Sequence, residues 1–127
     1  MSTRAGAEGE RIAEWILVRK GWKILDRQVR TDGGHILDCS ALHPLGPECL
    51  VEIKVWGADP SGKDTVKKAI GTAYDLREVG EIRPYVLVMS HHLSGNLGGM
   101  IERAHRAGVI YEVHVLGSSE PYSDDAS

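Results

Sequence analysis

The sequence predicts an α/β fold in which helices flank a mixed β-sheet. Three observations predict it. A helical stretch opens the chain, three strand-like runs then follow with only turns between them, and two later apolar runs each come after a helical stretch. Strands joined by short turns pair antiparallel, whereas strands joined through a helix pair parallel. A sheet with both kinds of connection is mixed, and helices cover both of its faces.

The first helix is expected over Arg4–Lys20, with Gly21 as its C-cap residue. Glu10 lies three and seven residues before Ala13 and Leu17, so we expect it at the margin of the buried stripe rather than fully outside. The apolar positions that follow helical spacing are Ile12, Ala13, Trp15, Ile16 and Leu17.

Three strands are expected next, over Trp22–Arg30, His35–Leu42 and Leu50–Trp56. Turn-rich segments at Thr31–Gly34 and His43–Glu48 separate them, so the three strands form an antiparallel meander.

The second half alternates helices and strands. Helices are expected over Lys63–Val79 and Leu97–Arg106, and strands over Pro84–Ser90 and Val109–Leu116. The Pro84–Ser90 run is nearly all apolar, as in a strand covered on both faces. We expect residues 1–117 to form a single domain and 118–127 to be a disordered acidic tail. The apolar side of the first of these helices holds Val66, Ala69, Ile70, Ala73 and Tyr74.

Glu52 and Lys54 interrupt an otherwise apolar strand, two positions apart. Because side chains alternate along a strand, Val51 and Ile53 share one face while Glu52 and Lys54 project from the other. Burying a lone charge is costly, so the two form a mutual ion pair or serve a metal site. Asp38 interrupts the preceding strand, and a hairpin can bring it beside Glu52. Two carboxylates there suit a hard divalent cation, which favours the metal site.

Composition is ordinary for a soluble protein: the 127 residues are 42% hydrophobic and carry a net charge of −3. That charge counts against an indiscriminate nucleic-acid binder, which has a basic excess. No apolar run is long enough to cross a membrane, and the opening segment lacks the apolar region of a signal peptide. We therefore expect a cytoplasmic protein in which Cys39 and Cys49 are buried free thiols.

Three motifs follow one another along the chain: Gly9-Glu10 in the first helix, Asp38 on the second strand and Glu52-Ile53-Lys54 on the third. In this order they resemble the motifs of the PD-(D/E)XK, restriction-endonuclease-like nuclease superfamily. The segments 8–15 and 21–25 look like the opening of its small resolvase-like members. The resemblance implies a restriction-endonuclease-like core of order αβββαβαβ and Mg²⁺-dependent or Mn²⁺-dependent hydrolysis of DNA. Two positions depart from relatives: Leu37 replaces a proline, and Ile70 replaces a glutamine.

Carried over by the resemblance, Asp38 and Glu52 hold the cation, with the Ile53 carbonyl as a further ligand. Lys54 positions or helps to deprotonate the attacking water and stabilises charge on the phosphate. Glu10 completes the outer shell or helps to hold a second cation, and Glu14, one turn on, competes for that role. Contacts to DNA are expected from the second helix, through Lys63, Lys67, Lys68 and Tyr74, although a solvated helix face explains its lysines equally well.

The expected function is a metal-dependent DNA endonuclease. A chain this short has little room to read sequence, so we expect DNA structure or a targeting partner protein to direct it. Homodimerisation, with Leu97–Leu116 as the contact, would let two sites cut two strands. Two alternatives stay open: a catalytically inactive module of the same fold that binds DNA or protein, and a soluble domain in which Glu52 and Lys54 are only an ion pair.

Overall fold

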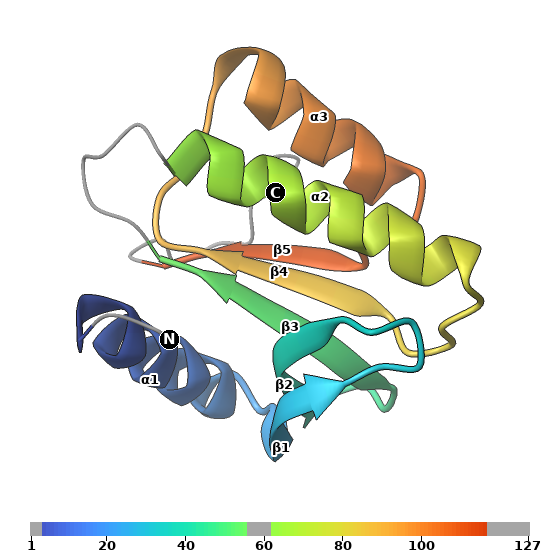
Figure 1. Ribbon diagram of the computed structural model, residues 1–127. Helices are drawn as coiled ribbons and strands as arrows, with labels where there is room; N and C mark the ends of the chain where they lie inside the picture. The colour runs from blue at the N-terminus through green and yellow to red at the C-terminus, as the bar shows by residue number, and fades with distance from the viewer. Residues whose placement is uncertain (1–3, 56–61, 117–127) are drawn as a thin grey trace.

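The computed structural model describes residues 4–55 and 62–116, with the side chains of 8–55 and 64–116. The order of elements is the predicted αβββαβαβ (Figure 1). The elements are α1 (Arg4–Arg19), β1 (Lys23–Arg30), β2 (Ile36–Leu42), β3 (Glu48–Lys54), α2 (Gly62–Glu78), β4 (Tyr85–Met89), α3 (Gly95–Arg106) and β5 (Glu112–Val115).

The five strands form one mixed sheet in the order β1-β2-β3-β4-β5. The pairs β1–β2 and β2–β3 are antiparallel, as the predicted meander requires, whereas β3–β4 and β4–β5 are parallel. Helix α1 lies on one face of the sheet, and α2 and α3 lie on the other (Figure 1). The predicted α/β class, with a mixed sheet between helices, is therefore confirmed.

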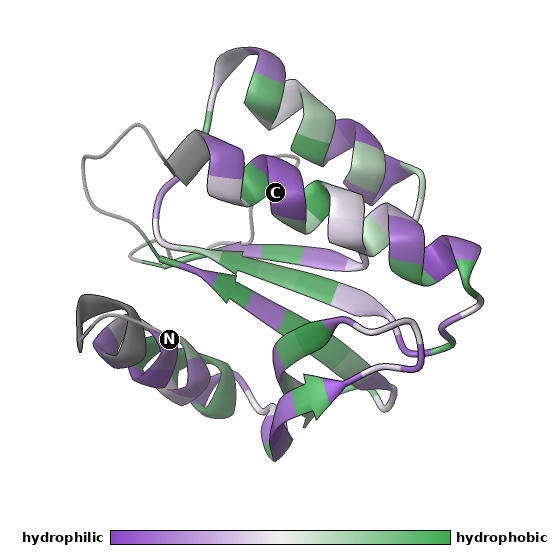
Figure 2. Cartoon of the chain, in the orientation of Figure 1, coloured by the Kyte–Doolittle hydropathy of each residue, from purple (hydrophilic) through white to green (hydrophobic). Residues whose placement is uncertain are grey.

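Each face of the sheet has its own apolar core. On the α2 and α3 face, Leu50, Leu87 and Met89 pack with residues of both helices. On the α1 face, Val51 and Val88 pack with residues of α1 and its C-terminal turn. All five residues of β4 are buried, which confirms a strand covered on both faces. Figure 2 shows this strand mostly in the green of hydrophobic residues. The alternation predicted for β3 is also present, since Leu50 and Val51 belong to opposite cores.

The buried side of α1 differs from the prediction. Ile12 and Trp15 are 53% and 58% exposed, whereas Ala13 and Leu17 are buried. The physical reason is the short distance between α1 and the sheet. The smaller residues Gly9 and Ala13 allow it, so their side of the helix is the buried one. The sequence pattern gives most weight to large side chains and therefore favoured another side. Glu10 is partly buried at the edge of this contact, as expected.

Other differences concern boundaries and one aromatic residue. Tyr74, expected on the apolar side of α2, is 49% exposed. Strand β3 begins at Glu48, two residues earlier than predicted, and β5 begins at Glu112, because Val109 and Ile110 form a turn on the Ala104 carbonyl. Trp56, the Lys63 side chain and the acidic tail at 118–127 lie outside the described residues.

Both cysteines are buried free thiols, as predicted. Burial raises the pKa of Cys39 to about 12, so its thiol stays protonated at neutral pH. In the part of the chain that the structure covers, no helix is both long and apolar enough to span a bilayer.

The observed orientation of α1 predicts that two substitutions on this helix differ in effect. Leu17→Ala removes a fully buried side chain and should lower the free energy of unfolding by about 2–5 kcal/mol. Ile12→Ala acts on a half-exposed residue and should change it by about 0.5 kcal/mol or less. Urea denaturation of both variants measures this. Equal losses would mean that α1 packs through the stripe read from sequence.

Candidate functional site

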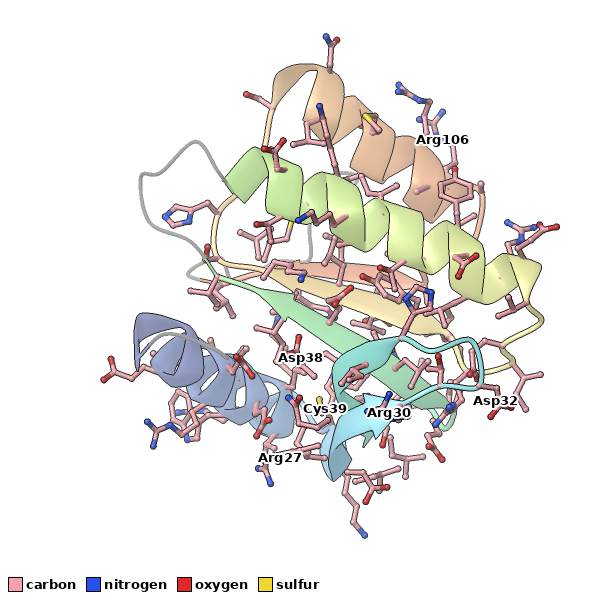
Figure 3. All side chains as sticks on the ribbon, in the orientation of Figure 1. Arg27, Arg30, Asp32, Asp38, Cys39 and Arg106 are labelled. Atoms are coloured by element: carbon pink, nitrogen blue, oxygen red, sulfur yellow. The ribbon has the colours of Figure 1, made fainter. Side chains whose placement is uncertain are left out.

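The candidate site begins where β2 separates from β3. The β2–β3 ladder ends at Cys39↔Val51, whereas β2 stays paired with β1 as far as Ile36. Two residues after Val51, the Ile53 N–H donates a hydrogen bond of 2.6 Å to Oδ2 of Asp38 instead of to a β2 carbonyl. The Asp38 side chain thus replaces a main-chain acceptor and is held at the point of separation. Figure 3 shows it on the side of the β1–β2 hairpin that faces α1.

The Asp38 carboxyl is in an environment that disfavours its charge. Burial is the main cause, and it raises the pKa to about 6 against an ordinary value of 3.8. The Ile53 N–H opposes this shift, the carboxylates of Glu10 and Glu52 add to it, and Lys54 lowers it. These interactions place Asp38 within electrostatic reach of the other three side chains predicted for the site.

Glu52 and Lys54 project from the same face of β3, as predicted. Glu52 is only 8% exposed, and its two oxygens are both engaged. The Tyr85 hydroxyl donates to Oε1 at 2.6 Å, and the Lys54 Nζ lies 3.5 Å from Oε2. The mutual ion pair that was one explanation of this sequence pattern is therefore present. Among the described side chains, none forms an ion pair with the Asp38 carboxyl, which Lys54 affects only electrostatically.

Tyr85 on β4 is a site residue that sequence reasoning missed. Burial raises its pKa well above the ordinary value, and the nearby Glu52 carboxylate raises it further, so the phenol stays protonated and donates to Glu52. A signal was available: a tyrosine hydroxyl inside an apolar strand needs a hydrogen-bond partner when it is buried. The sequence did not indicate which residue that partner was.

Gly9 explains how Glu10 comes close to Asp38. A Cβ atom on Gly9 would lie 2.7 Å from both Cγ atoms of Val55, which shows that α1 touches the end of β3 with no room for a side chain. This contact sets the position of the N-terminal half of α1, and therefore of Glu10. The Gly9-Glu10 pair noted in the sequence is thus a packing residue followed by a polar one.

Glu14, the competing candidate, is already engaged. Its carboxylate accepts three hydrogen bonds from Arg27 of β1: Nε lies 3.1 Å and 3.2 Å from the two oxygens, and Nη2 lies 2.7 Å from Oε1. Glu10 has no such partner within the described residues, and it acts directly on the pKa of Asp38. The geometry therefore favours Glu10 over Glu14 as the fourth member of the site.

The residues predicted to bind DNA lie on α2. Lys67 and Lys68 are exposed, and Tyr74 is half-exposed, so all three are accessible to a ligand. Lys63 begins this helix, but its side chain lies outside the described residues. No contact in the structure tests these four roles or that of the Ile53 carbonyl, and they stay predictions.

Among solved structures, the chain is similar to the EndoMS-dsDNA2 complex, with a TM-score of 0.53 and 18% sequence identity. The alignment covers 94% of this chain and 48% of that one, so this chain spans about half of its length. At this identity the similarity supports the fold. No protein-family model and no curated protein matches the sequence.

The raised pKa of Asp38 predicts a pH-dependent stability. Between about pH 4 and pH 6 the unfolded chain loses the proton while the folded chain keeps it, so stability falls as pH rises and stays lower above pH 6. Asp38→Asn keeps an oxygen acceptor for the Ile53 N–H and removes this cost. In EDTA at pH 8 the variant should be more stable by up to about 3 kcal/mol, with no gain at pH 3. Urea denaturation at both pH values measures this, and an equal gain at both would contradict it.

The Gly9 contact predicts that Gly9→Ala is destabilising although alanine is the better helix former. The added methyl must displace the stiff, β-branched Val55, at a cost of about 1–3 kcal/mol in unfolding free energy. The double variant Gly9→Ala/Val55→Ala should recover much of that loss, because it removes the opposing methyl groups. Thermal denaturation of the single and double variants checks this. Additive losses would mean that the two positions do not touch.

Proposed function

We propose that this protein is a divalent-cation-dependent nuclease that hydrolyses phosphodiester bonds in DNA. The observation that carries the proposal is the charge imbalance around Asp38. Asp38 interacts there with two carboxylates, those of Glu10 and Glu52, and with one ammonium group, that of Lys54, which is already paired with Glu52. A fold keeps a desolvated carboxyl in such a place at a cost, and a bound cation removes that cost.

The donor chemistry fits Mg²⁺ or Mn²⁺. Carboxylate and carbonyl oxygens are the ligands that these hard cations take, and Asp38, Glu52 and the Ile53 carbonyl supply them. Across residues 4–55 and 62–116, no three His, Cys, Asp or Glu side chains are close enough to hold a cation together. The remaining positions would belong to water and to the phosphate, which is usual for Mg²⁺ at phosphate sites.

Each residue then has a separate role. Asp38 and Glu52 would hold the cation, and Glu10 would complete the outer shell or help to hold a second one. When bound, the cation would supply a water of lowered pKa and offset the charge that develops on the phosphate. Lys54, near Glu52, would orient the attacking water and stabilise charge on the phosphate. Tyr85 holds the Glu52 carboxylate in one orientation through its hydroxyl.

Two further observations support DNA as the substrate. The structural neighbour is a complex with double-stranded DNA. The exposed side chains of Lys67, Lys68 and Tyr74 on α2 offer cations and an aromatic ring to DNA. Lys63 precedes them in the sequence. In this proposal DNA structure or a partner protein directs cutting, and a homodimer places two sites on two strands.

Cleavage assays test the proposal. Labelled four-way-junction, flap, duplex and single-stranded DNA would be incubated with the protein in Mg²⁺, Mn²⁺ or EDTA. We expect cutting that needs the cation and falls by about 100-fold or more in Lys54→Ala, because a charge that stabilises the transition state is lost. Lys20→Ala, which removes an exposed cation at the end of α1 that the proposal gives no role, is the matched control and should cut normally.

Two results would overturn the proposal. If Lys54→Ala cuts as fast as the parent protein, the activity does not come from this site. If no substrate is cut while DNA binding persists, the chain is a binding module of the same fold.

A further inference from the structure

A shallow groove lies between α1 and β1, outside the site described above. Its volume is about 550 Å³, and we call it the Trp15 surface. The exposed side chains that define it are Arg11, Trp15, Val18, Lys23 and Arg27.

Trp15 is an unusual residue to leave in solvent. Its side chain is 58% exposed, although indole is among the most favourable groups to bury. The Arg19 guanidinium lies over the ring, 4.8 Å from its centroid, in a cation–π contact that leaves more than half of the side chain exposed. The exposed part of the indole is available to stack on another ring.

The charge of the Trp15 surface is positive in a chain whose net charge is −3. Glu14, the acidic residue that lines the groove, is neutralised by Arg27 at 2.7 Å. Arg11 and Lys23 remain as cations on its walls, and Arg19 adds a third beside the indole. An aromatic platform among cations is how proteins bind single-stranded nucleic acids: bases stack and phosphates pair.

The groove also adjoins the proposed active site. Glu14, on its wall, occupies the same face of α1 as Glu10, one turn away. Arg27, on the opposite wall, is paired in the β-ladder with Cys39, the residue after Asp38. The Trp15 surface therefore lies beside the proposed site.

A second copy of the chain fits this surface less well. In a two-fold contact that pairs α1 with an antiparallel copy about Trp15, residue 11 of one copy faces residue 19 of the other. Both positions are arginine, and their like charges repel. Paired duplex DNA also fits poorly, because its bases already stack on one another and offer no free face.

We propose that the Trp15 surface binds a DNA strand with unpaired bases, one of which stacks on Trp15 while its phosphates contact Arg11 and Lys23. This inference rests on the proposed function for DNA as the ligand, and it deepens that function by naming substrates with unpaired segments.

Binding measured in EDTA tests the inference without any cleavage. The probes are fluorescein-labelled oligo-dT and a blunt duplex of equal length, followed by fluorescence anisotropy. We expect Trp15→Ala to weaken oligo-dT binding by about 5- to 150-fold and to change duplex binding by about twofold or less. Trp15→Tyr should keep most of the affinity, whereas Trp15→Leu should lose as much as alanine, because stacking needs a ring. The logarithm of the oligo-dT binding constant falls linearly with the logarithm of the salt concentration. Arg11→Gln and Lys23→Gln should each make that slope shallower by about 0.7.

Ile12→Ala is the matched control, since Ile12 is a neighbouring exposed apolar residue of α1 that does not line the groove. It should bind oligo-dT as the parent protein does. Unchanged oligo-dT binding by Trp15→Ala, retained binding by Trp15→Leu, or no oligo-dT binding at all would overturn the inference. So would a dimer in sedimentation that Trp15→Ala dissociates while oligo-dT affinity stays the same, because that result makes the surface a protein interface.

The two proposals fail separately. Loss of cleavage in every substrate, with Trp15-dependent binding intact, overturns the nuclease and keeps the strand-binding surface. Cation-dependent cutting that Lys54→Ala abolishes, with binding indifferent to Trp15, keeps the nuclease and overturns the surface.

Discussion

The hydrogen bond from the Ile53 N–H to Asp38 is the interaction on which the site depends. A buried main-chain donor must be satisfied, and where β2 separates from β3 the carboxylate of Asp38 takes the place of a strand carbonyl. The same bond holds a negative group against β3, beside Glu52 and Lys54. The irregularity of the sheet and the placement of the charged group are therefore one feature.

The rest of the molecule supplies the rigidity that this feature requires. Strand β4 is buried on both sides and brings Tyr85 under Glu52, while α2 and α3 close the core around it. Stability and chemistry oppose each other here, because desolvation disfavours the charged form of Asp38. A buried carboxyl with its pKa raised in this way is typical of functional sites.

The sequence predicted the order of elements, the mixed sheet and the shared face of Glu52 and Lys54, because turn residues and alternation are local signals. It did not predict which side of α1 is buried: the large side chains of Ile12 and Trp15 outweighed the small ones that allow close packing. It also missed the Tyr85–Glu52 bond, which joins residues 33 positions apart through β-sheet pairing. Contacts of that kind depend on register, and register becomes known only with the fold.

The tight contact of Gly9 with Val55 has a mechanical consequence. Helix α1 carries Glu10 near one end and Trp15 further along, and it is seated on the sheet with no free space at that point. Under the two proposals above, the cation and the unpaired base would contact the same helix, five residues apart along it. A substitution that lifts α1 off Val55 would displace both Glu10 and Trp15, so both proposed sites depend on the close approach that Gly9 allows.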